Sequence, residues 1–334
     1  NKGVFDKVYT TSFLRLLEYC DNEKKWGSIM ALTEDSSPLV RGAAAHSLFN
    51  NYGEEAYNLL IKLLGDDFRL VRLNAAYALS NNPVALSAPE ENSLLADALE
   101  EYRQSLVSQN DDWAAYYNLG NFYGSSGDHD NALEAYHNSI RVYPAAIMPM
   151  VNSGYIYALT GNMAEAEKMF ELALSYEPDN EAVLLNIALL YGETGREERA
   201  IAYLEKLLEV SENSAVAAYN LSILLADQDK SKSLELSRKA YIIEKENIKY
   251  AYTYSYYLGA NQEYAEAREV LKSLISLYPD YADSYILLSD IEIRSGNSGD
   301  AEDILREAIA NRNFTADQKQ KFEAILLSLT SIAE

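Results

Sequence analysis

The 334-residue sequence contains one cysteine, Cys20, and three histidines, and this scarcity excludes several kinds of site. A single cysteine provides no internal disulfide, no CxxC redox pair and no CxxCH haem attachment. His46, His129 and His137 each lack a second histidine or cysteine at a metal-ligand spacing. The segment Asp128-His129-Asp130 is interpreted as a solvated turn rather than as a metal contact. We therefore expect no metal ion and no cofactor.

Basic residues and long apolar runs are also scarce. The chain has 28 Lys and Arg against 51 Asp and Glu, which gives a net charge of −23. Nucleic acid is therefore not an expected partner, because Lys and Arg supply most of the affinity for phosphates. No apolar run approaches the roughly 18 residues of a membrane span, so we expect no membrane insertion. The start has neither an initiator Met nor a signal-like segment, and we expect an excised piece of a longer protein.

Catalytic motifs are missing as well. The sequence has no GxGxxG, no P-loop and no GxSxG. Its carboxylates are scattered over expected helix surfaces, so no acid–base pair can be named. We predict that the protein is not an enzyme. The apolar content of 48% is nevertheless enough for a continuous core.

The stretch 113–143 carries a pattern of small and apolar residues that returns every 33 or 34 residues. An i, i+3, i+4, i+7 stripe predicts a first helix, and a second stripe from Ala132 predicts another. The turn Gly127-Asp128 separates them, which makes the unit a helix hairpin. Six such hairpins are predicted over 113–315. The small residue of the first helix recurs at Gly120, Gly154, Ala188, Ser222, Ser255 and Ser289.

A different repeat precedes this array. Asp35 and Arg41 recur 31 residues later as Asp66 and Arg72, within two helix pairs that carry paired alanines. The aspartate can cap the second helix of each pair, and the alanines allow two helices to approach closely. Ahead of these pairs, 4–20 predicts an amphipathic helix. Its apolar side chains include Val8, Tyr9, Phe13 and Leu16.

These patterns resemble two known families. The 31-residue units resemble HEAT repeats, in which the Asp and Arg tend to pair between neighbouring repeats, so these four residues are expected to be structural. The later array resembles the tetratricopeptide repeat family, most fully over 113–146 and 147–180. The resemblance implies an all-α fold, an α-solenoid superhelix of antiparallel helix hairpins.

The repeats predict a division of the chain into four parts. These are HEAT-like repeats at 1–85, a joining helix at 86–112, six tetratricopeptide repeats at 113–315 and a C-terminal capping helix at 316–334. The segments 81–83 and 87–89 bracket the joint, and the joining helix would let both repeat types share one core. Thr315 and Gln318 fit a capping box for the last helix. The apolar stripe of that helix either caps the array or receives a partner, and we expect the cap.

Functional residues are sought on the face that packing leaves free. The position two before the small landmark is Asn118, Asn152, Asn186 and Asn220, a ladder facing what the resemblance implies is a concave groove. An amide offers a donor and an acceptor to an extended peptide backbone, and certain glycosyltransferases with such arrays use a similar ladder. The alternative is that asparagine is common at this family position and binds neighbouring backbone.

Tyrosines surround this ladder. The chain has 27 of them, and those on the groove side suit protein contact because a large ring carries a polar handle. Alternatively, they shield the interior of the superhelix. A Lys-containing clamp for an acidic C-terminus, known in some family members, is absent. The candidate groove residues beside the ladder are Tyr117, Asn121, Met148, Tyr155, Tyr219, Tyr252 and Tyr256.

The sequence as a whole predicts a non-enzymatic scaffold that binds a peptide or protein segment in its groove. The order of HEAT pair and array also resembles the C-terminal scaffold region of some bacterial multihaem c-type cytochromes. The alternative function is therefore the docking or assembly region of a larger redox enzyme outside the cytoplasmic membrane, in the bacterial periplasm. A third possibility, an enzyme, would need a cleft between the two arrays. The sequence does not indicate the partner's identity or an oligomeric state.

Overall fold

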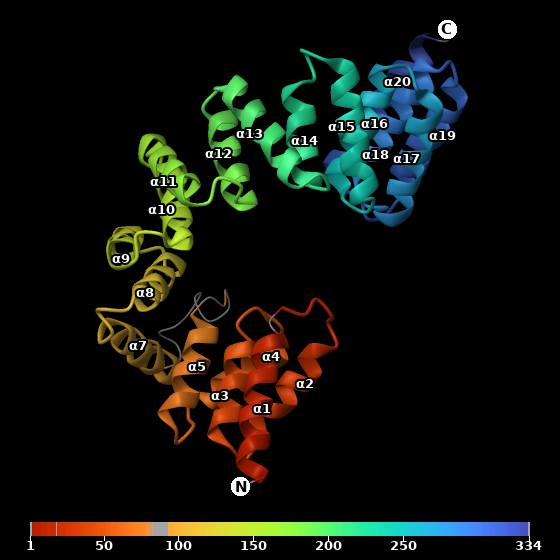
Figure 1. Cartoon of the computed structure of the whole chain (residues 1–334). Coiled ribbons are helices and arrows are strands. Elements are labelled where there is room, and N and C mark those ends of the chain that lie inside the picture. The colour runs from red at the N-terminus through yellow and green to blue at the C-terminus, as the bar shows by residue number, and fades with distance from the viewer. Residues whose placement is uncertain (1, 18, 81, 83–92, 333–334) are drawn as a thin grey trace. The chain divides into compact units, whose positions relative to one another are not determined.

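The computed structural model describes residues 2–17, 19–80, 82 and 93–332, and every regular element within them is a helix (Figure 1). The predicted all-α fold is therefore confirmed. The chain divides into two compact units, Asn1–Pro178 and Asp179–Glu334. Within the described residues, no helix is both long enough and apolar enough to cross a membrane.

The helices follow the predicted repeats. The first unit contains α1 (Lys2–Leu17), α2 (Lys25–Ala31), the 3₁₀ turn η1 (Leu32–Glu34), α3 (Pro38–Ser47), α4 (Glu54–Leu63), α5 (Arg69–Leu79), α7 (Ser93–Val107), α8 (Trp113–Ser125), α9 (His129–Val142), α10 (Ile147–Leu159) and α11 (Met163–Tyr176). The second unit contains α12 (Glu181–Glu193), α13 (Glu197–Val210), α14 (Ala215–Leu224), α15 (Lys230–Ile243), α16 (Ile248–Ala260), α17 (Tyr264–Leu277), α18 (Ala282–Arg294), α19 (Ser298–Ala310) and α20 (Ala316–Ile332).

The HEAT-like helices are joined by ion pairs between neighbouring repeats. The Arg41 guanidinium donates from Nε and Nη2 to the two carboxylate oxygens of Asp66, at 2.8 and 3.1 Å. The same Asp66 accepts from the backbone N–H of Phe68 and so holds the turn before α5. Asp35 does the same for Ser37 before α3. The predicted pairing of Asp and Arg between repeats is thus confirmed for Arg41 and Asp66.

The outer members of this set pair with other helices. Lys7 in α1 donates to Asp35 at 2.7 Å, and Arg72 in α5 donates to Glu101 in α7 at 3.1 Å from both Nε and Nη2. The chain of ion pairs therefore runs from α1 through both HEAT-like repeats into α7. The Arg72–Glu101 pair thus joins α7 to α5.

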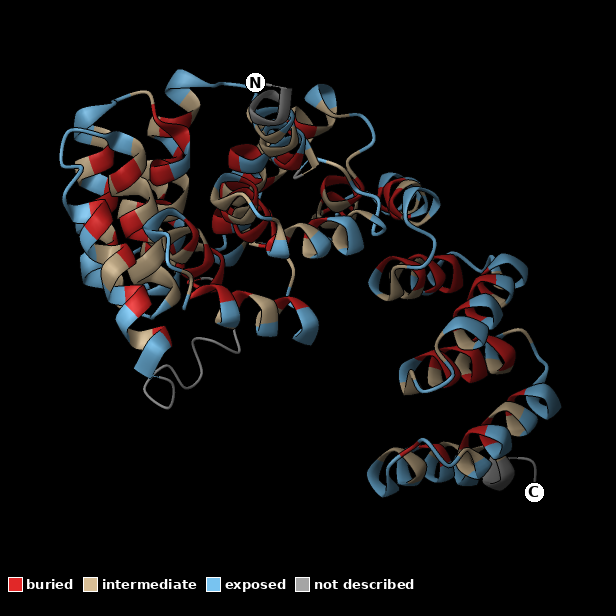
Figure 2. Cartoon of the chain, turned by 90° about the horizontal axis from the view of Figure 1, so that it is seen from below, coloured by how far each residue is buried: buried red, intermediate tan, exposed pale blue. Residues whose placement is uncertain are grey.

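One continuous core joins the HEAT-like helices to the first tetratricopeptide hairpin. It runs from Leu14 in α1 to Ala135 in α9 and includes Tyr102 of α7. Figure 2 shows the buried residues of the chain in red along the helices. The Ser125 hydroxyl at the end of α8 also donates to the carbonyl of Ser80 at 2.7 Å. The prediction that both repeat types share one core is confirmed. The predicted break at 81–83 and 87–89 lies outside the described residues, apart from position 82.

The first helix packs differently from its predicted pattern. Leu14 is its buried side chain, with 1% exposure, whereas Val8, Tyr9, Phe13 and Leu16 are exposed. The helix packs mainly against α3. The helix predicted over 4–20 is thus present as α1, but these four apolar side chains do not belong to its buried stripe.

The first two tetratricopeptide hairpins close through a glycine that faces a large ring. A Cβ at Gly120 in α8 would lie 2.4 Å from the ring of Tyr136 in α9, and one at Gly154 in α10 would lie 2.6 Å from Phe170 in α11. The glycines therefore allow the two helices of a hairpin to approach until the ring contacts the backbone. Six such helix pairs follow one another from α8 to α19.

The last helix covers the end of the array. The Thr315 backbone N–H donates to Gln318 Oε1 at 2.8 Å, and the Gln318 N–H donates to Thr315 Oγ1 at 3.3 Å. This is the predicted capping box. Phe322 is fully buried against Leu305 of α19 and Phe314. The apolar stripe of α20 thus caps the array, as expected.

A buried ion pair occupies the aromatic position of the sixth hairpin. Glu292 in α18 has 2% exposure, and Arg268 in α17 donates to it from both Nε and Nη2, the latter at 2.7 Å. Asn297 also donates to Glu292 at 3.0 Å. The hydrogen bond from Arg268, with this second donor, lowers the pKa of Glu292 to about 2. Glu292 occupies the position that Tyr123 has in the first hairpin, three residues after the small landmark. The sixth hairpin therefore has a hydrogen-bonded carboxylate where the first has a ring.

Replacing Gly120 with alanine should destabilise the first unit by about 1–3 kcal/mol, because the added Cβ would overlap the Tyr136 ring. Gly192→Ala is the matched control, since no atom lies within 4 Å of its Cβ. That control should leave stability unchanged or raise it by up to about 1 kcal/mol, through helix propensity. Urea unfolding followed by circular dichroism measures both. Equal effects at the two positions would contradict the ring contact.

Glu292→Gln should destabilise the second unit by about 1–3 kcal/mol at pH 7, because Arg268 then loses its charged partner. The folded-state pKa of Glu292 is depressed, so its contribution is present above about pH 4.5 and is lost as the pH falls from there toward about 2. The difference in unfolding free energy between wild type and variant should shrink over that range. Glu302→Gln, at the exposed Glu302–Arg306 pair, should cost well under about 1 kcal/mol.

Candidate functional site

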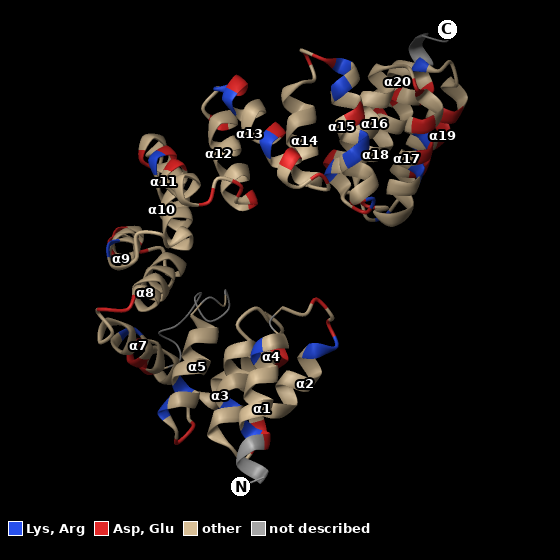
Figure 3. Cartoon of the chain, in the orientation of Figure 1, with Lys and Arg blue, Asp and Glu red and all other residues tan. Residues whose placement is uncertain are grey.

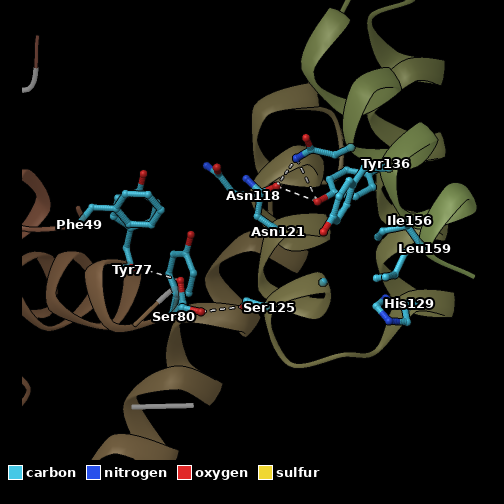
Figure 4. Close-up of a pocket in the computed structure, with 14 residues that line it drawn as sticks. Phe49, Tyr77, Ser80, Asn118, Asn121, Ser125, His129, Tyr136, Ile156 and Leu159 are labelled. Atoms are coloured by element: carbon cyan, nitrogen blue, oxygen red, sulfur yellow. Dashed lines mark hydrogen bonds between the residues drawn. The ribbon is translucent and has the colours of Figure 1, made fainter. Parts of the chain in front are cut away.

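A pocket of about 510 Å³ lies in the first unit, where the HEAT-like helices adjoin the first two tetratricopeptide hairpins (Figure 4). Side chains from the end of α3 through α5 and α7 line one part of it, and side chains from α8, α9 and α10 line the other. We call it the junction pocket. Its lining therefore comes from two repeat types that have different periods.

Aromatic rings form the HEAT-like side of the junction pocket. Phe49 and Tyr77 stack with ring centroids 4.6 Å apart and an interplanar angle of 13°. Tyr102 in α7 meets Tyr77 edge-on at 6.1 Å, and burial raises its pKa. Offset and edge-on ring contacts of this kind add stability beyond that of the buried area. Phe49, Tyr77 and Tyr102 thus form a shelf of contacting rings.

Three polar side chains on the opposite part hydrogen-bond to one another. The Tyr136 hydroxyl donates to Asn121 Oδ1 at 2.8 Å, and Asn152 Nδ2 donates to the same oxygen at 2.9 Å and to Tyr136 Oη at 3.3 Å. Burial raises the pKa of Tyr136 to about 12, so the phenol is neutral at physiological pH. This triad connects α8, α9 and α10 and fixes the wall of the pocket.

Other lining residues have polar atoms without partners among the described residues, or apolar surface that faces solvent. Asn118 lines the pocket next to the triad, and its side chain makes no hydrogen bond to any residue that the structure describes. Tyr155 and Leu159 of α10 are 62% and 59% exposed, so their apolar surface faces solvent. His129 Nδ1 is buried without a hydrogen-bond partner in the described part of the chain. Asn118 is therefore an amide free to bind a ligand.

Among the residues that the structure describes, no Lys, Arg, Asp or Glu lines the junction pocket. The helices α8 and α10, which supply much of its lining, contain no such residue at all (Figure 3). Their hairpin partners carry the charges, for example Glu134 and Arg141 in α9 and Lys168 in α11. In a chain that is 24% charged, the first helices of the first unit thus present an uncharged surface.

The structure brings together four of the predicted groove residues. Asn118, Asn121, Asn152 and Tyr155 all line the junction pocket. Tyr117 instead packs on the ring of Tyr136, with centroids 6.1 Å apart. Met148, from the start of α10, is 54% exposed and lies outside the lining.

The other predicted residues belong to the second unit. Asn220 donates to the carbonyl of Val216 one turn earlier at 2.7 Å, whereas Asn186 makes no side-chain hydrogen bond to a described residue. Tyr219 packs on Tyr250, with centroids 4.8 Å apart.

Tyrosines also gather along α16. Tyr252 packs edge-on against Tyr281 with ring centroids 6.0 Å apart, and Tyr256, which is exposed, contacts Tyr257. Burial, followed by the nearby Asp283 carboxylate, raises the pKa of Tyr252. The second unit therefore has a tyrosine-rich surface of its own, on α14, α16 and the start of α18.

Sequence reasoning missed the HEAT-like side of the pocket. Phe49, Tyr77 and Ser80 lie outside the 34-residue repeat, so the spacing that identifies the groove positions does not reach them. Tyr102 fits that spacing, 34 residues before Tyr136, but it marks a packing position. The one sequence signal for this side is that α7 matches the second helix of a hairpin but has no first helix of its own repeat type before it.

Known protein families match most of the chain. A tetratricopeptide repeat model matches residues 157–229 and 260–320, and a second such model matches 113–145. Together these matches cover half of the chain. A HEAT repeat model matches residues 14–110. Both family resemblances found in the sequence are therefore confirmed, whereas the resemblance to multihaem cytochromes is not shown and stays an expectation.

Solved structures show the same fold at low sequence identity. Yeast Tom70 is 15% identical, with a TM-score of 0.54 over 97% of this chain and 70% of that one. PilF of Pseudomonas aeruginosa is 17% identical, with a TM-score of 0.51 over 66% and 98%. A tetratricopeptide repeat protein from Parabacteroides merdae is 20% identical, with a TM-score of 0.50 over 66% and 90%. No curated protein sequence matches the chain.

Asn152→Ala should lower the stability of the first unit by about 1–2 kcal/mol, because Asn121 and Tyr136 then lose a hydrogen-bond donor. Asn186→Ala changes the equivalent position of the next hairpin, where the amide has no such partner, and should change stability by less than about 0.5 kcal/mol. Urea unfolding of each full-length variant provides the comparison. If both variants unfold alike, the triad does not stabilise the pocket wall.

Proposed function

Because the chain belongs to the tetratricopeptide repeat family and carries a HEAT-like region ahead of its array, we propose that it binds an extended segment of a partner protein along the first helices of its hairpins. As a member of this family it is a protein-interaction scaffold. Scaffolds of the family are generally non-catalytic, and we propose no reaction for it.

The observation that supports this proposal most directly is the convergence of predicted groove residues on the junction pocket. Asn118, Asn121, Asn152 and Tyr155 come from two consecutive first helices and line one cavity. Asn118 and Asn152, which occupy the same position in consecutive repeats, thus line the same pocket. A hollow with a few fixed polar groups among apolar side chains is the usual form of a binding site.

The two kinds of side chain in the pocket have complementary tasks. The Asn118 amide has a donor and an acceptor available, which matches a peptide group of an extended segment. The Tyr155 ring, exposed beside it, adds apolar contact area at low entropy cost, since its side chain has only two rotatable angles. Asn121 and Asn152 are already bonded to Tyr136 and hold the pocket wall in place.

The second unit contributes a surface of the same kind to the proposal. Asn186, Asn220 and the tyrosines Tyr219, Tyr252 and Tyr256 lie on the first helices of its hairpins. Tyr117 and Met148, at the same face of α8 and α10, complete the proposed contact set. Within this set, Asn220 is bonded to its own helix, so Asn186 is the amide of the second unit that is free to bind.

The alternative role, a docking region of a larger periplasmic redox enzyme, is not favoured by any specific feature of the pocket. It stays an expectation from the order of the repeats. It also requires protein contact, so the same surface would serve it.

A segment selected from a random peptide library against the full-length protein provides the test. Asn118→Ala should weaken its binding by roughly 2- to 10-fold, because one hydrogen bond is worth about 0.5–1.5 kcal/mol. Circular dichroism confirms that helicity persists. Asn110→Ala, at an exposed amide in the turn before α8, is the matched control and should leave affinity unchanged. A segment whose affinity is insensitive to Asn118 and to Tyr155→Ala would sink the proposal for this face.

A further inference from the structure

The junction pocket has features that go beyond a face for an extended backbone. Tetratricopeptide hairpins supply only part of its lining, and Phe49, Tyr77 and Tyr102 supply the rest. The Arg72–Glu101 ion pair and the Ser125–Ser80 hydrogen bond fix α7 and α8 against α5. The pocket is therefore a built cavity between two repeat types, with a fixed shape.

The charge of the lining limits what can enter. An ionised group buried without a partner carries a large desolvation penalty. Among the described lining residues there is one histidine, His129, and no Lys, Arg, Asp or Glu to pair with such a group. Ionised Tyr136 is also not available, since burial raises its pKa to about 12. The cavity thus selects uncharged groups, although the chain as a whole carries a net charge of −23.

The shape and the apolar surface of the cavity suit a ring. The stacked Phe49 and Tyr77 form a shelf, and Tyr155 and Leu159 present exposed apolar surface across the opening. A volume of about 510 Å³ accommodates a large aromatic side chain together with the backbone that bears it. Ring-on-ring contact adds about 0.5–1.5 kcal/mol beyond burial of area.

The polar groups of the cavity can bind the backbone of the segment. Asn121, Tyr136 and Asn152 hydrogen-bond to one another, which holds them in the wall. Asn118 lines the same cavity without a hydrogen bond to the described residues. One free amide beside an apolar shelf matches a single residue with its own peptide group.

We propose that the junction pocket receives an uncharged aromatic side chain of the bound protein segment, with the adjoining peptide group hydrogen-bonded to Asn118. The inference rests on the proposed function and specifies its partner: a segment with an exposed Phe, Tyr or Trp and no charged residue next to it. The HEAT-like region then takes part in recognition as well as in the shared core.

Three end-blocked amino acids test this with the full-length protein: N-acetyl-phenylalaninamide, N-acetyl-lysinamide and N-acetyl-glutamic acid α-amide. Saturation-transfer NMR titrations give their dissociation constants. The phenylalanine derivative should bind in the millimolar range and at least tenfold more tightly than either charged derivative. Equal affinities for the three would overturn the inference.

Two substitutions locate the binding. Tyr155→Ala and Asn118→Ala should each weaken binding of the phenylalanine derivative roughly 3- to 10-fold. Because Tyr155 is exposed and Asn118 makes no internal hydrogen bond, both variants should stay folded. Tyr176→Ala, at an exposed ring near the end of α11, and Asn110→Ala are the matched controls and should bind as wild type does.

The outcomes separate this inference from the proposed function. If the phenylalanine derivative does not bind, or binds equally to Tyr155→Ala and wild type, the aromatic assignment is wrong. The library-selected segment can still lose affinity on Asn118→Ala in that case, and the proposed function then stands. If the selected segments contain an aromatic residue whose replacement by alanine costs as much as Tyr155→Ala, the inference is supported.

Discussion

The contact between a small residue of one helix and a large ring of the next determines much of this structure. The Tyr136 ring occupies the space that a Cβ at position 120 would need, so α8 and α9 can close only because residue 120 is glycine. That closure fixes which side of α8 is buried. The opposite side of α8, which includes Asn118, is then left available to a ligand. A ligand can bind there without disturbing the packing of the hairpin.

The small-and-large period accounts for what the sequence could predict. It gave the six hairpins, and the 31-residue period gave the Arg41–Asp66 pair, because both are local or nearest-neighbour packing rules. The junction pocket was not predictable in this way. Phe49 and Tyr77 of its shelf lie outside the 34-residue period that contains its amides. How Tyr77 meets Tyr102 depends on how α7 packs against α5. No spacing within either repeat contains that information.

The asparagine ladder shows a second limit of periodic reasoning. Asn118 and Asn152 occupy the same position in consecutive repeats, yet only Asn152 makes internal hydrogen bonds. Its partners are Asn121 and Tyr136, and one repeat later the equivalent of Tyr136 is Phe170, which has no hydroxyl. Whether an amide is free therefore depends on residues elsewhere in the repeat, so identical spacing yields both wall-forming and available side chains.

The distribution of charge connects these features to recognition. An acidic chain of this size gains solubility from its surface charge, and the second helices, such as α9 and α11, carry that charge. The first helices α8 and α10 carry none. At the pocket wall, Asn152 also donates a hydrogen bond to the Tyr136 hydroxyl. An uncharged hollow within a strongly acidic protein discriminates by desolvation: a charged side chain loses its hydration there and gains no partner, whereas an aromatic ring loses only unfavourable contact with water.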